Sequence, residues 1–381
     1  MTRRAAHFSC IRHWLLALQL AALVTGAPAL AGVTLDGTMG PTGSFSGNMT
    51  VPASVGTQRG ANLFHSFGTF NIFTGESLYF TATGSSAAIS NVISRVTGGS
   101  GSTINGVLGS TVPGASVFLI NPGGIVFGAS AQLDVSGSFY ASTANYLTLA
   151  DGGRFDATTP SNTVLTVATP AAFGFLGPTP AAITVSGSIL QVPDGQSLGL
   201  IGGEVSVSGA AILAAPGGNL HLVSAASAGE ANIGAGAFEV SSFATPGAIS
   251  ISGGSTMDVS EPAGQTIGGG TVYIRGGSLV LDGSSLLAKT AAGSSGGVDI
   301  SVFGDMMMAA DALIDSSSSG TGQAGNVNVA AAGTMSMDAS RITSRSSGDG
   351  NAGNIQISAA SLNLINSSIS SSGGYSADGN P

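Results

Sequence analysis

Short runs in which apolar and polar residues alternate recur along most of the chain. Period-two alternation is typical of β-strands that bury one face, because successive side chains point to opposite sides. Glycine, asparagine, aspartate or proline interrupts nearly every run, as expected at turns between strands. No stretch after Ala31 keeps the 3.6-residue apolar spacing of an amphipathic helix. The pattern predicts an all-β chain, with alternating runs at 77–81, 183–185, 204–207, 249–251 and 271–275.

The segment 117–144 (VFLINPGGIVFGASAQLDVSGSFYASTA) shows the local unit most clearly. An apolar run at 117–120 meets an Asn-Pro-Gly-Gly turn at 121–124, and a second β-rich run follows at 125–127. The next stretch, 132–139, alternates again. This order of strand, turn and strand without a helix predicts a chain built from short stacked strands.

Longer copies of this unit follow one another in the last third of the chain. They begin at Gly270, Gly297, Gly325 and Gly353, at spacings of 27, 28 and 28 residues, and a looser copy begins at Gly247. Each copy holds three short apolar runs, and three strands in about 28 residues is what one coil of a parallel β-helix needs. The prediction is one quasi-one-dimensional stack of coils spaced about 4.8 Å apart. The inward-facing residues of the last two copies are expected to be Val327, Val329, Ile355, Ile357, Leu362 and Leu364.

A stack of coils exposes an unpaired strand edge at each end, which favours aggregation unless the edge is covered. The region from Val33 to about Phe80 is less repetitive and richer in aromatic residues, and it is expected to form an N-terminal cap. At the other end, the chain stops at Pro381, where a fifth copy would begin. This stop suggests a rod that is truncated.

The first 31 residues have the pattern of a secretory signal peptide. Arg3, Arg4 and Arg12 form a basic region, and an apolar run of about eleven residues follows at 14–24, too short to span a membrane. The cleavage pattern is provided by Ala29 and Ala31. Residues 1–31 are therefore predicted to be removed, and no stable membrane insertion of the mature chain is expected.

Composition narrows the classes of partner. Loss of the three arginines leaves seven of the ten basic residues against all 19 acidic ones, a net charge of −12. Such a chain is a poor ligand for nucleic acid. The only cysteine, Cys10, leaves with the signal peptide, so the mature chain holds no disulfide that would oppose passage through a pore. Charged residues make up only 8% of the chain, which fits a stacked β-solenoid better than a compact globule.

Six blocks, in order, resemble the N-terminal secretion domain of two-partner-secretion exoproteins of the filamentous haemagglutinin type. They begin at Asn62 (NLFHSFGTFNI), Ile89 (ISNVISRVTGG), Ile104 (INGVLGS), Phe139 (FYASTANYLTLADGGRF), Thr169 (TPAAFGFLG) and Ile201 (IGGEVSVSGA). Together with the segment that holds the turn at 121–124, the resemblance covers about residues 33–240. The third turn residue is Asn in the family and Gly123 here. Glycine accepts a positive φ even more readily than asparagine, so the turn geometry is expected to survive.

The resemblance implies a right-handed single-stranded parallel β-helix (β-solenoid) with an N-terminal cap. It also implies export without ATP, through the periplasm and a dedicated outer-membrane β-barrel transporter whose periplasmic domains recognise the N-terminal domain. By this resemblance the transporter recognises two blocks, and His65 is a cap or docking residue. The expected recognition residues are Asn62, Leu63, Phe64, His65, Ser66, Phe67, Asn121, Pro122, Gly123 and Gly124.

Candidate chemistry is sparse. The mature chain has two histidines, His65 and His221, and His221 is expected to face outward from the alternating run 220–222. Two G-x-G-x-x-G matches at 320–325 and 348–353 recur at the repeat period and precede strands, so they are interpreted as repeat junctions and not as dinucleotide sites. No catalytic residue, cofactor or metal ligand is predicted.

The remaining open alternative is an acidic stretch on one repeat. Asp299, Asp305, Asp311 and Asp315 fall six, six and four residues apart, so they share a face if the turns between them cooperate. Carboxylate clusters of this kind serve polysaccharide-cleaving enzymes.

The sequence therefore predicts a signal peptide (1–31), a secretion domain (32–240) and β-helix repeats of about 28 residues (241–381). The predicted function is a secreted or surface-exposed adhesin that binds a glycan or protein receptor on a host or other cell. The alternative is a β-helical carbohydrate-active enzyme or glycan-binding exoprotein.

Overall fold

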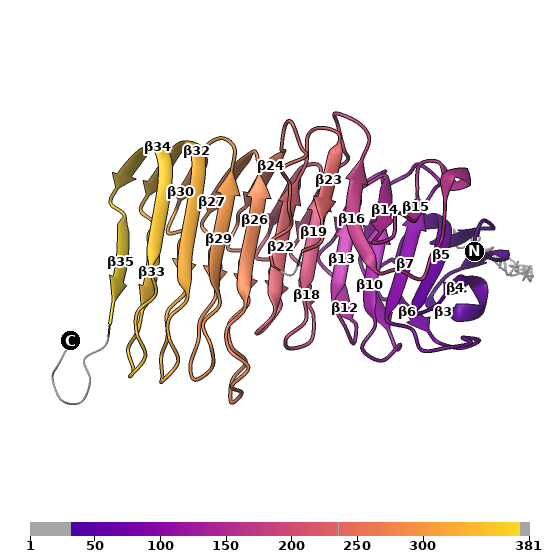
Figure 1. Cartoon of the computed structure of the whole chain (residues 1–381), viewed down its shortest axis with the longest axis horizontal. Coiled ribbons are helices and arrows are strands. Elements are labelled where there is room, and N and C mark those ends of the chain that lie inside the picture. The colour runs from indigo at the N-terminus through magenta and orange to yellow at the C-terminus, as the bar shows by residue number, and fades with distance from the viewer. Residues whose placement is uncertain (1–31, 235, 374–381) are drawn as a thin grey trace, which may run out of the picture. The chain divides into compact units, whose positions relative to one another are not determined.

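The structure is a computed structural model that describes residues 32–234 and 236–373 (Figure 1). The predicted signal peptide, with Ala29 and Ala31, and the predicted truncation at Pro381 lie outside the described residues. Within these ranges the chain forms parallel coils that follow one another in chain order, which confirms the all-β parallel β-helix. No helix in the described part of the chain has the length and apolar character needed to cross a membrane.

Three parallel walls make up the coils. The first wall comprises β5 (Asn62–Phe70), β7 (Asn91–Val96), β10 (Ser116–Ile120), β13 (Phe139–Ser142), β19 (Leu198–Gly202), β22 (Asn219–Ser224), β26 (Thr271–Gly276), β29 (Gly297–Val302), β32 (Asn326–Asp338) and β34 (Ile355–Ile365). The second comprises β8 (Ser102–Ile104), β11 (Ile125–Phe127), β17 (Ile183–Ser186), β20 (Val205–Ser208), β24 (Ala248–Ile251), β27 (Ser278–Asp282) and β30 (Met306–Ala309). It continues in the C-terminal parts of β32 and β34, where Met335 pairs with Met306 and with Leu362. The third comprises β3 (Asn48–Pro52), β6 (Ser77–Thr81), β9 (Val107–Ser110), β12 (Gln132–Asp134), β18 (Ile189–Gln191), β21 (Ile212–Ala214), β25 (Thr256–Asp258), β28 (Ser285–Leu287), β31 (Leu313–Asp315), β33 (Arg341–Arg345) and β35 (Ser368–Ser372).

The strand register confirms that each predicted repeat is one coil. Val298 pairs with Val272 on one side and with Val327 on the other, and Val327 then pairs with Ile355. The copy predicted to begin at Gly247 is out of step with the others. Its first strand, β24, pairs with β27 in the second wall and not with β26 in the first. The start of this copy is wrong by one strand, because the first-wall strand of the same coil is β22. An inserted strand, β23 (Gly229–Asn232), separates β22 from β24 along the chain.

The interior of the coils is a continuous apolar core that runs through all three walls. Val327 and Val329 are buried in it as predicted, whereas Ile355 and Ile357 are only partly buried. Leu362 and Leu364 were expected to be buried and are 44% and 47% exposed. Both lie on β34, which pairs with β32 on one side and with no described strand on its other side, so nothing described covers them.

The cap is smaller than predicted. Its antiparallel strands are β1 (Val33–Asp36), β2 (Thr42–Phe45) and β4 (Thr57–Arg59), which pair with each other or with β5. A 3-10 turn, η1 (Ala53–Val55), precedes β4. The parallel walls begin inside the region assigned to the cap, because β3 already pairs in parallel with β6.

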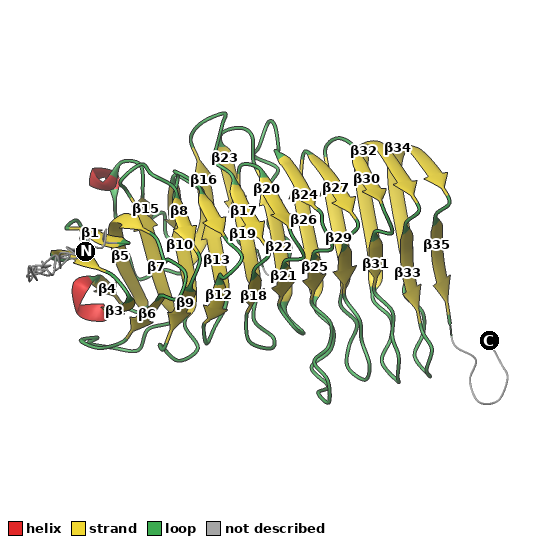
Figure 2. Cartoon of the chain, turned by 180° about the vertical axis from the view of Figure 1, so that it is seen from behind, coloured by secondary structure: helices red, strands yellow, loops and turns green. Residues whose placement is uncertain are grey.

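A second sheet lies outside the coils, against the first wall (Figures 1 and 2). It contains β15 (Arg154–Asp156), β14 (Tyr146–Leu149), β16 (Pro170–Phe175) and β23, all antiparallel, with a 3-10 turn, η2 (Pro160–Asn162), after β15. Its apolar side packs on outward residues of the first wall, including Phe64, Phe118 and Ile120. The first wall is therefore buried on both faces through most of β5 to β22. From β26 to β32 buried side chains alternate with half-buried or exposed ones, and β34, the last first-wall strand described, is half-buried to exposed. The sequence interpretation did not predict this outer sheet.

The alternation of buried and exposed side chains along β32 allows a stability test in the repeats. Val329→Asp would place an unpaired charge in the core, and it should lower the free energy of unfolding by more than about 3 kcal/mol. Ala330→Asp is the matched control, because Ala330 is the exposed neighbour of Val329 on β32 and its partners in register, Ser301 and Ser358, carry no charge. It should change stability by less than about 0.5 kcal/mol. Urea denaturation of the two variants measures the difference, and equal midpoints would show that Val329 does not face the core.

Candidate functional site

The first expected recognition block, residues 62–67, forms the start of β5 and is fully buried. Leu63, His65 and Phe67 face the interior of the coils, where His65 lies 5.3 Å from the ring of Phe80. Phe64 faces the other way into the outer core, 5.1 Å from the ring of Phe155. None of the six side chains is more than 2% exposed. A partner docking on the folded domain therefore does not touch them directly.

His65 is held neutral by its surroundings. Its Nε2 lies 3.4 Å from the carbonyl oxygen of Pro52, and its Nδ1 has no hydrogen-bond partner. Burial lowers the pKa of His65 to about 4, because the imidazolium would lose its hydration.

Asn62 connects β5 to the outer sheet. Its Oδ1 accepts a hydrogen bond from Nδ2 of Asn91 at 2.8 Å, one strand along the first wall. Its Nδ2 donates to the carbonyl oxygen of Ala168 at 2.7 Å and, at 3.4 Å, to that of Thr166. The buried side chain therefore connects the coil, through hydrogen bonds, to the segment that leads into β16.

A buried arginine that the sequence interpretation missed makes the second connection. Arg95 on β7 is 0% exposed, and its Nε donates to Oγ of Ser66 at 2.8 Å. One terminal nitrogen donates to Oγ1 of Thr163 and to the carbonyl oxygen of Asp156, both at 2.5 Å. The guanidinium also lies 4.4 Å from the ring centre of Phe155. A charged residue inside the apolar run VISRV was the available indication in the sequence.

The charge of Arg95 is balanced within the same network. Asp36, from the cap strand β1, accepts hydrogen bonds from Ser66 at 2.6 Å and Thr97 at 2.7 Å. Burial lowers the pKa of Arg95 to about 10, while the nearby carboxylates of Asp36 and Asp156 oppose that shift, so the side chain stays protonated at neutral pH. Cap, coil and outer sheet therefore meet at one buried cation.

The second expected block, residues 121–124, is the turn between β10 and β11. Asn121 is buried, and its Oδ1 accepts a hydrogen bond from the backbone N–H of Gly123 at 2.8 Å, which makes the turn. Its Nδ2 donates to the carbonyl oxygen of Ser100 at 3.0 Å and to Oγ of Ser102 at 2.9 Å. Asn121 thus stabilises the turn of its own coil and binds that coil to the preceding one at Ser100 and Ser102. The turn lies at the opposite strand end from Asn62, so the two blocks do not form one surface.

The positive φ expected at Gly123 is found one residue later in the chain. The positive φ in this turn, 107°, belongs to Gly124. At Gly123 the constraint is space, because a Cβ would stand 2.7 Å from the carbonyl carbon of Ser100. The Asn of the family turn would therefore push the neighbouring coil away in this chain.

Comparisons with known proteins decide the family. The model of the TPS secretion domain matches residues 31–239, more than half of the chain. The chain belongs to the TPS secretion domain family. Among solved structures, the HMW1 secretion domain from Haemophilus influenzae has 19% identity and a TM-score of 0.45, covering 91% of this chain and 98% of that chain. The filamentous hemagglutinin secretion domain has 14% identity and a TM-score of 0.35, covering 88% and 99%. No curated protein matches the sequence.

Membership makes the protein a two-partner secreted exoprotein. A TPS secretion domain implies a partner outer-membrane transporter and export across the outer membrane. The matched residues hold the cap, the buried Arg95 network, the 121–124 turn and the outer sheet.

His221 of the secretion domain corrects another expectation. It points away from the coil interior as predicted, but it is only 3% exposed. The ring lies 4.9 Å from that of Phe238 and stacks on Tyr273 at 5.2 Å. Burial lowers its pKa to about 4, with a smaller contribution from the charge of Arg275. The sequence alternation gave the correct direction but could not show that another segment covers this face.

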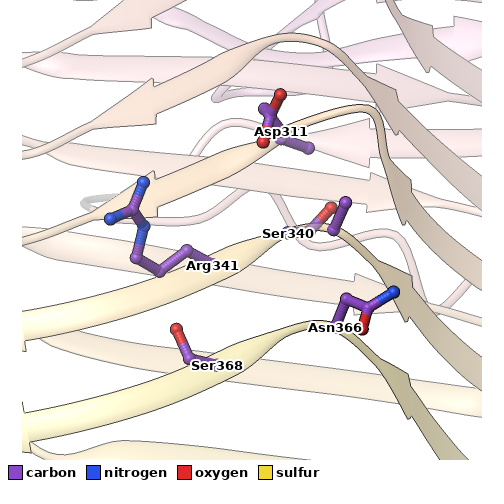
Figure 3. Close-up of a pocket in the computed structure, with 7 residues that line it drawn as sticks. Asp311, Ser340, Arg341, Asn366 and Ser368 are labelled. Carbon is purple, nitrogen blue, oxygen red and sulfur yellow. The ribbon is translucent and has the colours of Figure 1, made fainter.

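The acidic stretch beyond the secretion domain is mostly engaged in contacts between coils. Asp299 pairs with Arg275 and Asp315 with Lys289, each at 3.2 Å, and Asp305 accepts a hydrogen bond from the N–H of Thr334 at 2.7 Å. Asp311 lines a hollow of about 200 Å³ together with Arg341 (Figure 3). In residues 32–234 and 236–373, no three His, Cys, Asp or Glu side chains gather as metal ligands would.

Burial of the two histidines predicts an acid-sensitive secretion domain. Both pKa values lie near 4 in the folded chain and near 6.5 when unfolded, so protonation favours unfolding. The contribution of the two neutral histidines to stability should be intact above about pH 6.5, fall as the pH drops toward about 4, and level off below. Each histidine contributes up to about 3 kcal/mol to this loss.

The measurement is urea denaturation from pH 7.5 to 4.5 of the mature chain and of the variant with His65→Leu and His221→Leu. Carboxylate contributions remain in both proteins, so the difference isolates the histidines. An equal loss in the variant would contradict neutral burial of the two rings.

Proposed function

We propose that this exoprotein is an adhesin of the filamentous haemagglutinin type, with residues 32–240 as the export domain and 241–381 as β-helix repeats displayed at the cell surface. The observation that supports this division is the change in the first wall. It is covered by the outer sheet as far as β22, whereas the repeats present a more open polar face with Tyr273, Asp299, Asn328 and Gln356 in register. Such a face suits an extended contact with a receptor glycan or protein.

Recognition by the transporter is the first part of the proposal. The folded N-terminal coils would dock on the periplasmic domains of the outer-membrane barrel, after which further coils add one at a time outside the cell. Co-expression with and without the transporter tests this directly. Mature protein should reach the medium or surface only when the transporter is present.

The 121–124 turn should be needed for export. Replacing Asn121 and Pro122 by Ala removes the turn hydrogen bond and both links to the neighbouring coil, at a cost of about 1–3 kcal/mol. The variant should accumulate in the periplasm. Asn366→Ala, in a turn of the repeats, is the control and should be secreted normally. Immunoblots of periplasm and medium measure both, and unchanged secretion of the first variant would contradict the proposal.

A glycan-cleaving activity is the second candidate, favoured only by the hollow that Asp311 lines with Arg341, Asn366 and Ser368 (Figure 3). An adhesin should bind sugars on a glycan array without releasing reducing ends from them. Turnover of a bound glycan that is lost in Asp311→Asn would replace the adhesin proposal with an enzyme.

A further inference from the structure

The segment 163–168 carries the two most exposed large hydrophobic side chains among the residues that the structure describes. Val167 is 69% exposed and Val164 is 59% exposed. Leu165 and Ala168 of the same segment pack against the outer core instead. One side of the segment is therefore anchored, and the other presents two valines to solvent.

Buried polar side chains hold this segment at both ends. Arg95 donates to Oγ1 of Thr163 at 2.5 Å, and Asn62 donates to the carbonyl oxygens of Ala168 and Thr166. Between these points, the backbone of Val164 exchanges two hydrogen bonds with that of Arg154, at 2.8 and 2.9 Å. Val167 also lies against the turn before β5, where a Cβ on Gly60 would approach it to 3.1 Å. These hydrogen bonds fix the backbone that carries the two exposed valines.

Arg95 and Asn62 are polar side chains buried at positions between the coil and the outer segment. Replacing a buried ion pair by apolar residues of similar volume is often neutral or stabilising, so burial alone does not make these groups a source of stability. Their hydrogen bonds do fix the position of the segment that they bind. Here that position is the path of 163–168 across the outer sheet.

We propose that the exposed side of 163–168, with Val164 and Val167, is the surface that the partner transporter contacts, and that the buried block 62–67 acts through it. This inference rests on the proposed recognition of the domain by the transporter. The block itself is inaccessible, and 163–168 is the exposed apolar surface to which it is hydrogen-bonded.

The choice of occupant follows from where the segment lies. It leads into β16 of the outer sheet and is bridged to β15 at Arg154. The outer sheet occurs within the residues that match the TPS secretion domain and not on the described repeats, and that family implies the transporter as partner. A second exposed pair, Ile189 and Ile212, lies in register on β18 and β21 of the third wall. No described hydrogen bond joins the side chains of Asn62 or Arg95 to that pair, so it serves as the matched control.

The experiment compares two double variants of the full mature chain, Val164→Ser with Val167→Ser, and Ile189→Ser with Ile212→Ser. Binding to the purified full-length transporter in detergent and the secreted fraction in cells are measured for each. The valine variant should bind about tenfold or more weakly, since two apolar side chains lose their contact, and its thermal midpoint should not change. The isoleucine variant should bind and be secreted like the wild type.

A third variant, Arg95→Met, tests the indirect role of the buried network. It keeps both valines but frees the start of the segment, and it should weaken transporter binding while the repeats stay folded by limited proteolysis. Wild-type binding by the valine variant, or equal weakening by the isoleucine variant, overturns the inference while transporter-dependent export stands. Export of the wild type without the transporter overturns the proposed function instead.

Discussion

The parallel backbone ladder is the constraint on which the rest of the structure depends. Each strand pairs with the equivalent strand of the coils before and after it, so a residue and its partners in register share one environment. A side chain therefore needs a neighbouring coil to be buried, as Leu362 and Leu364 on β34 show. The same rule explains the recurring glycines, because Gly348 and Gly350 lie directly against the backbone carbonyls of Gly320 and Gly322, where no Cβ fits.

The N-terminal part differs from the repeats because its first wall is covered. Its strands are buried on both faces, which removes the alternation that the repeats keep. Side chains that start on this wall join it to the outer layer. Arg95 and Asn62 are two such side chains, since both start in the coil and end on the outer segment, and Arg95 also reaches the cap through Thr38 at 2.9 Å. The region that matches the family, residues 31–239, is therefore a stack of coils to which buried hydrogen bonds attach a second sheet.

Sequence periodicity was sufficient for the coil, because three apolar runs in about 28 residues leave few alternatives to a parallel β-helix. It failed where an insertion interrupts the coil: β23 shifted the apparent start of the copy at Gly247, and β14 to β16 look like any other short strands. The apolar run 117–120 did carry evidence of two-sided burial, since Phe118 and Ile120 face the outer core. For the site, the sequence located Asn62 and Asn121 but not their roles. Those roles depend on partners such as Ala168 and Ser100, which periodicity cannot pair.

Hydrogen–deuterium exchange on the full mature chain, wild type against Arg95→Met, tests most directly whether this buried cation joins the two layers. In the wild type, amides of 154–168 should exchange slowly. In the variant they should exchange faster, together with those of β1, while β32 and β33 should be unchanged because coils interact only with their neighbours. Unchanged protection of 154–168 in the variant would contradict the coupling. Loss of protection along the whole stack would show that Arg95 supports the fold at large and not this connection.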